Sequence, residues 1–397
     1  MRQSKRRMKT IYLDHAATTP VDPAVRIAME PYMSAGFGNP SSIHRMGQRA
    51  RMALDEARES AASDVGATPA EILFTSGGTE SDNAAIRGAA FAGGAAGRKH
   101  LVVTAIEHEA VLEACLDLEY RWGFEVTRVN PDRDGIVAVD AVAEAIRSDT
   151  SVVSVMYANN EIGTIQPVSQ IGALCRDRGV TFHVDAVQAA GVLPIDVNRD
   201  NIDLLALSAH KFYGPKGVGA LYVRKGIQWW PSQLGGGQER GRRSGTENVP
   251  GIVGLATALK LALEAAPETR EQLEQMRDYI FDWLLGKVND AVANGSRSAR
   301  LPGNVNISFP GVGGEALVMA LDSKGIMASS GSACSSGSTE PSHVLQAIGC
   351  SPDVAGGALR LTLGRENTWD DIYETVQEVA DATRRLSNWP ATVGKSR

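Results

Sequence analysis

The stretch DLLALSAHKFYGPKGVGALYV, residues 203–223, is the part of the sequence that decides the fold. It contains two short apolar runs, 203–209 and 217–223, and each run is typical of a buried strand. A Gly-Pro-Lys-Gly turn separates the runs and follows Lys211. Most lysines in loops are solvated, but a lysine that follows a buried strand can form a Schiff base.

Similar apolar runs alternate with helical patterns upstream of this stretch. The predicted strands are 71–75, 100–105, 124–129, 151–158 and 180–185, and the predicted helices are 79–90, 109–122, 140–148 and 168–179. This alternation predicts an α/β fold, in which a mostly parallel sheet carries helices on both faces. Ligands of such sheets bind at the carboxyl ends of the strands, so polar residues after the runs are the site candidates.

The pattern changes after residue 248. A long helix is predicted at 248–288, followed by strands at 304–309 and 358–363 and helices at 314–324 and 368–387. These elements predict a smaller α+β domain, on which the N-terminal segment packs. We expect a large domain at 21–264 and a small domain formed by 1–20 and 265–397, with a cysteine-containing loop at about 327–341.

Composition limits the class of protein. The chain has 397 residues, 43% of them hydrophobic and 22% charged, which excludes a disordered or fibrous protein. A net charge of -6 argues against direct nucleic-acid binding. The four cysteines have no metal-site spacing and suggest no disulfide scaffold, so we expect no metal and a cytoplasmic location. Glycines or charges interrupt the apolar stretches, and we expect no membrane span.

A carboxylate accompanies the lysine. Asp185 ends the run VTFHVD, and it lies 26 residues before Lys211, at the end of the preceding strand. A single aspartate in this position is more often a helix N-cap. The pair, however, is the arrangement that pyridoxal phosphate enzymes need, because the aspartate keeps the pyridine nitrogen protonated while the lysine binds the aldehyde.

A phosphate site and a histidine complete this set. FTSGGTESDNAA, residues 74–85, is a strand, a glycine turn and a helix start, so the N–H groups of Gly78 and Thr79 can bind an anion. The alternative is an ordinary capped helix, with Thr79 and Asp82 as a loose capping box. Ser208 and His210 can add donors to the phosphate. His108 follows the strand at 100–105, where it can stack on a planar cofactor and move protons.

Cys334 differs from the other cysteines. Cys115 and Cys175 lie in helical patterns and are expected in the core. Cys334 lies in SSGSACSSGSTEPS, a polar Gly/Ser-rich segment that predicts an exposed and reactive thiol. The alternative is an unreactive surface thiol.

Taken together, these motifs resemble the class V aminotransferase-type enzymes. The resemblance implies pyridoxal phosphate as the cofactor and the protein fold called fold type I of pyridoxal phosphate-dependent enzymes. The motifs resemble most closely the cysteine desulfurases of the NifS/IscS kind, in the first desulfurase group. The resemblance runs through nearly the whole chain, in order: YLDHAATTP, FTSGGTESDN, EHEAV, NNEIGTIQP, HVDAVQAAG, SAHKFYGPKGVGALYV, GGGQERGRRSGT, SSGSACSSG and LRLTLGR.

The resemblance implies a role for each matching residue. Lys211 would bind the cofactor aldehyde and move the substrate α-proton, and Cys334 would receive the sulfur of L-cysteine. Cofactor contacts would come from Gly78, Thr79, His108, Asn160, Asp185, Gln188, Ser208 and His210. Thr246 would reach the phosphate of the neighbouring subunit, which implies a homodimer with shared sites. Asn160 and Arg360 would hold the substrate carboxylate.

The resemblance also implies a sulfur-acceptor protein, for iron–sulfur cluster assembly or thiolation, and Cys334 could ligate an iron–sulfur cluster transiently. Two features depart from the family pattern: Glu109 replaces a basic residue, and the C-terminus is short. The alternatives are a selenocysteine lyase, another class V aminotransferase or lyase, and a non-catalytic sulfur carrier or docking protein. A dinucleotide-binding oxidoreductase is disfavoured, because no GxGxxG follows the first strand.

Overall fold

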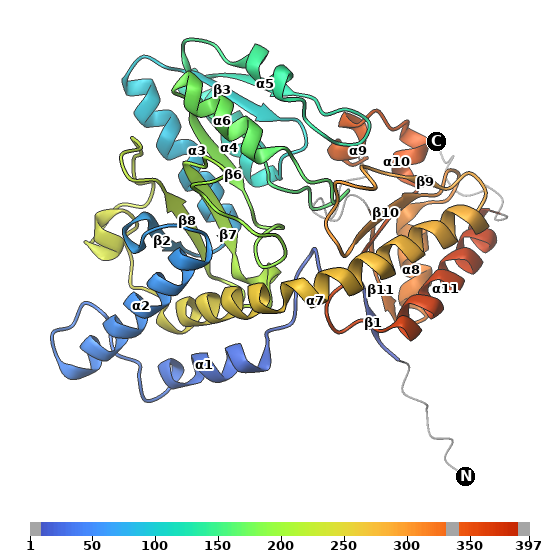
Figure 1. The fold of residues 1–397 in the computed structure, drawn as a ribbon, viewed down its shortest axis with the longest axis horizontal. Helices are drawn as coiled ribbons and strands as arrows, with labels where there is room; N and C mark the ends of the chain where they lie inside the picture. Colours follow the sequence, from blue (N-terminus) through green and yellow to red (C-terminus); the bar gives the residue numbers. More distant parts are fainter. Residues whose placement is uncertain (1–8, 331–340, 388–397) are drawn as a thin grey trace, which may run out of the picture.

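The computed structural model describes residues 9–330 and 341–387. Within these residues, the large domain is built on a seven-stranded sheet with the order β2-β8-β7-β6-β5-β3-β4 (Figure 1). Its strands are β2 (Ile72–Thr75), β3 (His100–Thr104), β4 (Glu125–Val129), β5 (Thr150–Ser154), β6 (Thr181–Asp185), β7 (Leu204–Ser208) and β8 (Gly219–Val223). β8 is antiparallel to both of its neighbours, and the other neighbouring pairs are parallel. The predicted α/β class is therefore confirmed.

Helices cover both faces of this sheet. Along β3, Leu101 and Val103 belong to one buried cluster and Val102 belongs to another, because successive side chains of a strand point to opposite faces. The helices that follow the strands are α3 (Gly78–Ala95), α4 (Glu109–Trp122), α5 (Val139–Ala145) and α6 (Val168–Arg178). Both faces are apolar as a result, which explains why most of these strands are continuous apolar runs.

Two strand predictions differ from the structure. β4 was expected to be buried, but it is the edge strand, and Glu125 and Arg128 are exposed there. An edge strand has one free side, where charged residues discourage pairing with another chain. The strand predicted at 151–158 ends at Ser154; the chain then continues beside β6, with the Val155 and Tyr157 N–H groups donating to its carbonyls.

The small domain contains a second sheet with the order β12-β13-β10-β9, beside a parallel pair formed by β1 and β11. Its strands are β1 (Ile11–Tyr12), β9 (Val292–Ala293), β10 (Asn304–Ser308), β11 (Ile326–Met327), β12 (Ser329–Ser330) and β13 (Ala358–Thr362). Its helices are α8 (Gly314–Asp322), α9 (His343–Ala347), α10 (Pro352–Gly356) and α11 (Trp369–Ser387). β1 places the N-terminal segment on this domain, as the sequence predicted.

The helix α7 (Val249–Lys287) joins the two domains and runs between them in Figure 1. Its first half packs against α1 (Pro23–Met33) and α2 (Arg45–Asp64), and its second half packs against β10 and α11. By length and composition it is the one helix among the described residues that could cross a membrane, but half of its apolar window is buried inside the protein. This packing explains its apolar character. The described residues also form three short 3-10 turns, which are η1 (Pro69–Glu71), η2 (Ala209–Lys211) and η3 (Gln238–Gly241).

Candidate active site

Lys211 and Asp185 meet at one edge of the large sheet. Asp185 is the last residue of β6, and Lys211 ends the turn η2 that directly follows β7. These strands are parallel neighbours, so their carboxyl ends lie side by side. Burial raises the pKa of Asp185, and the charge on Lys211 acts against this rise, so the two side chains interact electrostatically. The structure thus brings together the two residues on which the sequence argument depended.

The Lys211 amine is held by the N-terminal segment. Its Nζ donates to the carbonyl oxygens of Ala16, at 2.6 Å, and Ala17, at 2.8 Å. The Gln188 amide nitrogen donates to the same Ala16 carbonyl, at 3.0 Å. Residues almost two hundred positions apart in the chain therefore lie together on one side of the site.

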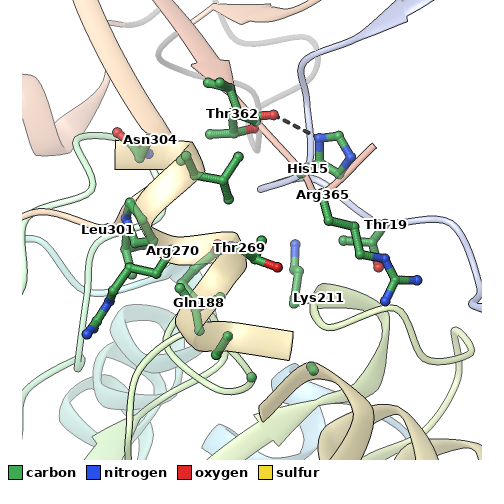
Figure 2. Close-up of a pocket in the computed structure, with 18 of the residues that line it drawn as sticks. His15, Thr19, Gln188, Lys211, Thr269, Arg270, Leu301, Asn304, Thr362 and Arg365 are labelled. Carbon is green, nitrogen blue, oxygen red and sulfur yellow. Dashed lines mark hydrogen bonds between the residues drawn. The ribbon is translucent and has the colours of Figure 1, made fainter. Parts of the chain in front are cut away.

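Lys211 lines a pocket between the two domains. In Figure 2 its amine points toward a space surrounded by residues from both domains and the N-terminal segment, among them His15, Gln188, Thr269, Asn304 and Arg365. His15 is tied to the small domain, because its Nδ1 lies 2.9 Å from the carbonyl oxygen of Thr362. An amine in this position faces an opening between domains rather than the closed core.

Three carboxyl groups lie buried beneath this edge of the sheet. Burial raises the pKa of Asp185, although the charges on His108 and Lys211 oppose the shift. Burial also raises the pKa of Glu107 to about 8 and raises the pKa of Asp82 well above its ordinary value. Within the described part of the chain, Asp82 Oδ1 and Glu107 Oε2 have no hydrogen-bond partner. A cationic group bound here would therefore be stabilised.

A neutral histidine lies next to Asp82. The Nε2 atom of His183 is 3.5 Å from Asp82 Oδ1, and its Nδ1 atom is 2.9 Å from the Ser154 hydroxyl. Burial lowers the pKa of His183 to about 3, so the ring is uncharged at neutral pH. His183 consequently does not neutralise the acidic floor of the site.

His108 lies at the start of α4, after the loop that leaves β3. Its Nδ1 accepts a hydrogen bond from the Ala110 N–H at 3.1 Å and so caps the helix. This contact leaves Nε2 as the ring nitrogen that carries the proton in the neutral form. Glu109, which departs from the family pattern, is exposed on the first turn of α4.

The glycine turn before α3 forms an anion cradle. Gly77 is the N-cap residue at φ 153°, a conformation that favours glycine, and the first intrahelical bond is from Ser81 N–H to the Gly77 carbonyl. The N–H groups of Gly78 and Thr79 precede that bond. A Cβ on Gly78 would lie 2.8 Å from Val187 Cγ2, so only glycine leaves this space open. The alternative capping box is wrong, because neither Thr79 nor Asp82 is the N-cap.

Ser208, the last residue of β7, borders this cradle, and His210 follows it in η2. Ser208 is buried, and its Cβ would be 3.4 Å from a Cβ placed on Gly78. The Nδ1 atom of His210 lies 3.1 Å from the Thr18 hydroxyl. Burial, helped by the charges on Lys211 and Lys216, lowers the pKa of His210 to about 4. Both residues are therefore uncharged hydrogen-bonding groups at neutral pH.

Arg360 and Asn160 are brought together although 200 positions separate them. Arg360 is 2% exposed; its Nη1 donates to the Asn160 carbonyl at 3.2 Å, and its Nη2 forms a salt bridge with Asp14 at 2.9 Å. The Nε atom is buried without a hydrogen-bond partner among the described residues. The guanidinium thus retains a donor, and its Asp14 contact is one that a substrate carboxylate could replace.

Two predicted residues are not part of this cluster. Thr246 is exposed and lines a separate recess with Ser76 and Arg243. Cys334 lies outside the described residues. Among the described residues, no group of three His, Cys, Asp or Glu side chains could hold a metal ion. Cys115 and Cys175 are buried, as predicted.

The residues present fit pyridoxal phosphate. The cradle at Gly78 offers N–H groups to a phosphate, the Lys211 amine can bind an aldehyde, and the buried Asp185 can stabilise a protonated ring nitrogen. The orphaned carboxyl oxygens of Asp82 and Glu107 strengthen this argument, since the ring would add a positive charge where the protein has none to pair with them.

The sequence argument missed several residues at this site. They are His15, Asp14, Asp82, Glu107, Glu161, Ser342 and His343. A polar residue within three positions of a predicted strand end was the available signal for Glu107 and Glu161. Asp14, Ser342 and His343 had no such signal, because distant parts of the chain bring them to the site.

Comparisons with known proteins agree with this geometry. The family model described as Aminotransferase class-V matches residues 11–374. Cysteine desulfurase IscS of Methanosarcina thermophila is 50% identical over 380 residues, which are 96% of this chain and 93% of that protein. A solved NifS-like protein has a TM-score of 0.89 at 37% identity, over 95% of this chain and all of that one. The structure of SspA in complex with cysteine has a TM-score of 0.80 at 38% identity, covering 90% of this chain and 100% of SspA.

The fold and the lysine–aspartate pair define an α/β enzyme that acts at the carboxyl edge of its sheet. The chain belongs to the class-V aminotransferase family, since the family model and the relatives both cover most of its length.

Proposed function

We propose that this chain is a pyridoxal phosphate-dependent cysteine desulfurase, which converts L-cysteine to L-alanine and transfers the sulfur to Cys334 as a persulfide. The observation that carries this proposal is the meeting of Lys211 and Asp185 at adjacent strand ends, beside the glycine cradle. The relatives support it as well, because one is named a cysteine desulfurase and another was solved with cysteine.

Each residue of the cluster has a part in binding. Gly78, Thr79, Ser208 and His210 would hold the phosphate, Asp185 the ring nitrogen and Gln188 the phenolic oxygen, while His108 would stack on the ring. Asn160 and Arg360 would hold the substrate carboxylate. Pyridoxal phosphate supplies an electron sink, which makes the α-proton of bound cysteine acidic. The Lys211 amine takes this proton, and its contacts to Ala16 and Ala17 show where the amine can rest.

The sulfur transfer balances without a further oxidant. The Cys334 thiolate attacks the substrate sulfur, a new S–S bond forms, and the bond between sulfur and the substrate β-carbon breaks. The electron pair of that bond stays with the β-carbon, which takes up a proton and becomes the methyl group of alanine. The β-carbon is reduced by two electrons, and each of the two sulfur atoms in the new S–S bond is oxidised by one.

The described ends of the segment that contains Cys334 both lie at the site. On one side, β12 ends at Ser330 and pairs with β13 beside Arg360. On the other side, Ser342 bonds to the residue that follows Asn160. Cys334 is four positions after Ser330 and eight before Ser342, spans of at most about 14 Å and 28 Å of extended chain. A cysteine in this segment is tethered near the proposed carboxylate site.

The test is Cys334→Ser. The variant should bind the cofactor and change its absorption when L-cysteine is added, because proton removal needs Lys211 and not Cys334. It should release almost no alanine, because a hydroxyl is a much poorer nucleophile toward sulfur than a thiolate. In the wild type, mass spectrometry after a cysteine pulse should find one added sulfur on the Cys334 peptide. Cys350→Ser is the control, since Cys350 is half-buried and lies outside the site.

Alanine formation by Cys334→Ser at the wild-type rate would contradict the mechanism. Sulfur on the Cys350 peptide would contradict the assignment of the acceptor cysteine.

We also propose a homodimer in which Thr246 reaches the phosphate of the second copy. Thr246 is exposed and lies apart from the Lys211 pocket, as a shared site requires. A group of large apolar side chains on α1, α2 and the segment between them is exposed in the single chain: Ile27, Met33, Phe37, Ile43 and Met52. Ultracentrifugation should give twice the chain mass, and Phe37→Glu with Ile43→Glu should give monomers that bind the cofactor poorly. A wild-type monomer with full activity would exclude shared sites.

The wider setting follows from the same proposal. The persulfide would pass to a sulfur-acceptor protein, for iron–sulfur cluster assembly or thiolation, in the cytoplasm. The free thiols of Cys115, Cys175 and Cys350 support a reducing compartment. We place the domain boundaries at 21–264 for the large domain and at 1–20 with 265–397 for the small one. The change of packing partners along α7, close to Pro267, supports this division.

A further inference from the structure

The short helix α9 connects the small domain to two loops of the active site. The Ser342 hydroxyl, at the N-terminus of α9, lies 2.5 Å from Glu161 Oε2. His343 Nε2 lies 3.0 Å from the carbonyl oxygen of Glu107, which directly precedes His108. Apolar contacts accompany these bonds, in one buried cluster that contains Val344, Leu345 and Ile348 from the α9 region and Ile106, Met156 and Ile162 from the large domain.

The Glu161 backbone is fixed from both domains. Its N–H donates to the Asn159 side chain at 2.8 Å, and its carbonyl accepts from the side-chain amides of Asn304, at 3.3 Å, and Asn306, at 3.1 Å. These two asparagines belong to β10 of the small domain. Glu161 directly follows Asn160, so the same short turn also contributes to the proposed carboxylate site.

The Glu161 carboxylate is buried and depends on Ser342. Glu161 is 5% exposed, and burial raises its pKa, whereas the Ser342 hydrogen bond and the nearby charges of His343 and Arg360 act against the rise. The Ser342 hydroxyl donates to this carboxylate and accepts from the Leu345 N–H at 3.2 Å. A single hydroxyl therefore caps α9 and satisfies a buried acid of the other domain.

We propose that Glu161 is a positioning residue that, through Ser342, fixes the N-terminus of α9 against the loop of Asn160, and that this contact sets the rate of sulfur transfer. The inference rests on the proposed function. Ser342 is eight positions from Cys334, and it lies beside the loops of Asn160 and His108. A shift of about 1 Å at a reacting group can reduce a rate about 100-fold, so the anchor of a tethered nucleophile affects its reaction.

The variants that test this are Glu161→Ala, Glu161→Gln and Ser342→Ala. Ser351→Ala is a matched control, because Ser351 caps the neighbouring short helix α10 in the same way, through the Val354 N–H at 3.4 Å, and is exposed. Ser351→Ala removes a helix cap alone, whereas Ser342→Ala removes a cap and the contact between domains. Glu161→Gln keeps an acceptor for the Ser342 hydroxyl and should show the smaller defect of the two Glu161 variants.

The first measurement is hydrogen–deuterium exchange of the holoenzyme without cysteine. Peptides that cover α9 should exchange faster in Glu161→Ala and Ser342→Ala than in the wild type, and Ser351→Ala should leave α9 unchanged. Equal protection of α9 in all variants would overturn the proposed anchor. This measurement does not depend on catalysis, so it remains informative if the chain proves not to be a desulfurase.

The second measurement is single-turnover sulfur loading of Cys334, followed by mass spectrometry. Glu161→Ala and Ser342→Ala should load sulfur about tenfold more slowly or worse, with normal cofactor content and a normal absorption change on adding L-cysteine. Faster exchange of α9 with unchanged loading would overturn the claim that the anchor sets the transfer rate. Failure of the wild type to load Cys334 would instead refute the proposed function.

Discussion

The floor of the active site and the junction between the domains are built on opposite principles. The floor consists of Asp82, Glu107 and Asp185, which are buried and come from one domain. The junction consists of contacts between segments distant in the chain, such as Lys211 with Ala16 and Arg360 with Asn160. The carboxyl groups of the floor are shielded from water, whereas Lys211 and Ala16 of the junction line a pocket.

This difference assigns different tasks to the two regions. A buried acidic floor is costly in the empty protein, and a bound cation would relieve that cost, so the floor favours a permanently bound cofactor. The Arg360 guanidinium and the Lys211 amine can exchange their partners for a ligand. A ligand carboxylate or carbonyl can replace the Asp14 carboxylate at Arg360 or the Ala16 carbonyl at Lys211. In the proposed function, Asp185 of the floor would contact the cofactor and Arg360 of the junction would contact the substrate, so substitutions should separate these two effects in experiments.

The largest effect is expected from Lys211→Ala. This change removes both the amine that binds the aldehyde and the base for the α-proton, so the rate of alanine formation should fall by about 1,000-fold or more. Lys216→Ala is the control, since Lys216 is exposed in the same loop. Borohydride reduction of the wild type followed by peptide mapping should find the pyridoxyl group on Lys211. A label on Lys216 would contradict the assignment of Lys211 as the lysine that binds the aldehyde.

An intermediate effect is expected from Arg360→Ala. Loss of a bidentate contact to the substrate carboxylate should remove about 2–4 kcal/mol of transition-state stabilisation. This loss corresponds to a roughly 30- to 1,000-fold lower kcat/KM for cysteine. Cofactor absorption should hardly change, because Arg360 belongs to the junction. Arg360→Lys keeps the charge without the planar guanidinium group, and its kcat/KM should lie between those of the wild type and Arg360→Ala. An unaltered kcat/KM in Arg360→Ala would show that other groups hold the carboxylate.

The smallest effect is expected from Glu107→Gln, measured as the melting temperature of the cofactor-free protein. The pKa of Glu107 is raised from 4.5 to about 8, so the folded protein holds a proton that the unfolded chain has lost. Stability should therefore fall as the pH rises from 6.5 to 8, a window above the ordinary pKa of 6.5 at which the His183 and His210 side chains of the unfolded chain lose their protons.

Glu107→Gln should remove part of this fall, by about 2–5 °C. Glu109→Gln, the exposed neighbour, should leave the pH dependence as in the wild type. Parallel pH curves for Glu107→Gln and the wild type would mean that Glu107 does not hold a proton in the folded protein, and the acidic floor would then be less costly than argued here.

Local sequence signals predicted much of this molecule. The alternation of apolar runs and helical patterns identified the strands of the large sheet and the helices α3 to α6 to within a few residues, since burial between two helix layers demands continuous apolar strands. The failure at β4 has the same cause: an apolar run does not show whether its strand is central or at the edge. Lys211, Asp185, His108 and Gly78 could be found because each lies at the end of a predicted strand or within three positions after it.

By itself, the sequence determined the fold class, the sheet edge that carries the site and the residue types that can bind a phosphorylated aldehyde. These properties depend on local periodicity and on the rule that parallel strands end at the same edge. The tertiary structure alone decided that Arg360 contacts Asp14 and Asn160, that Asp82 is a buried acid rather than a cap, and that Ser342 satisfies Glu161. Such contacts join residues far apart in the chain, and their strength depends on burial, which no local pattern records.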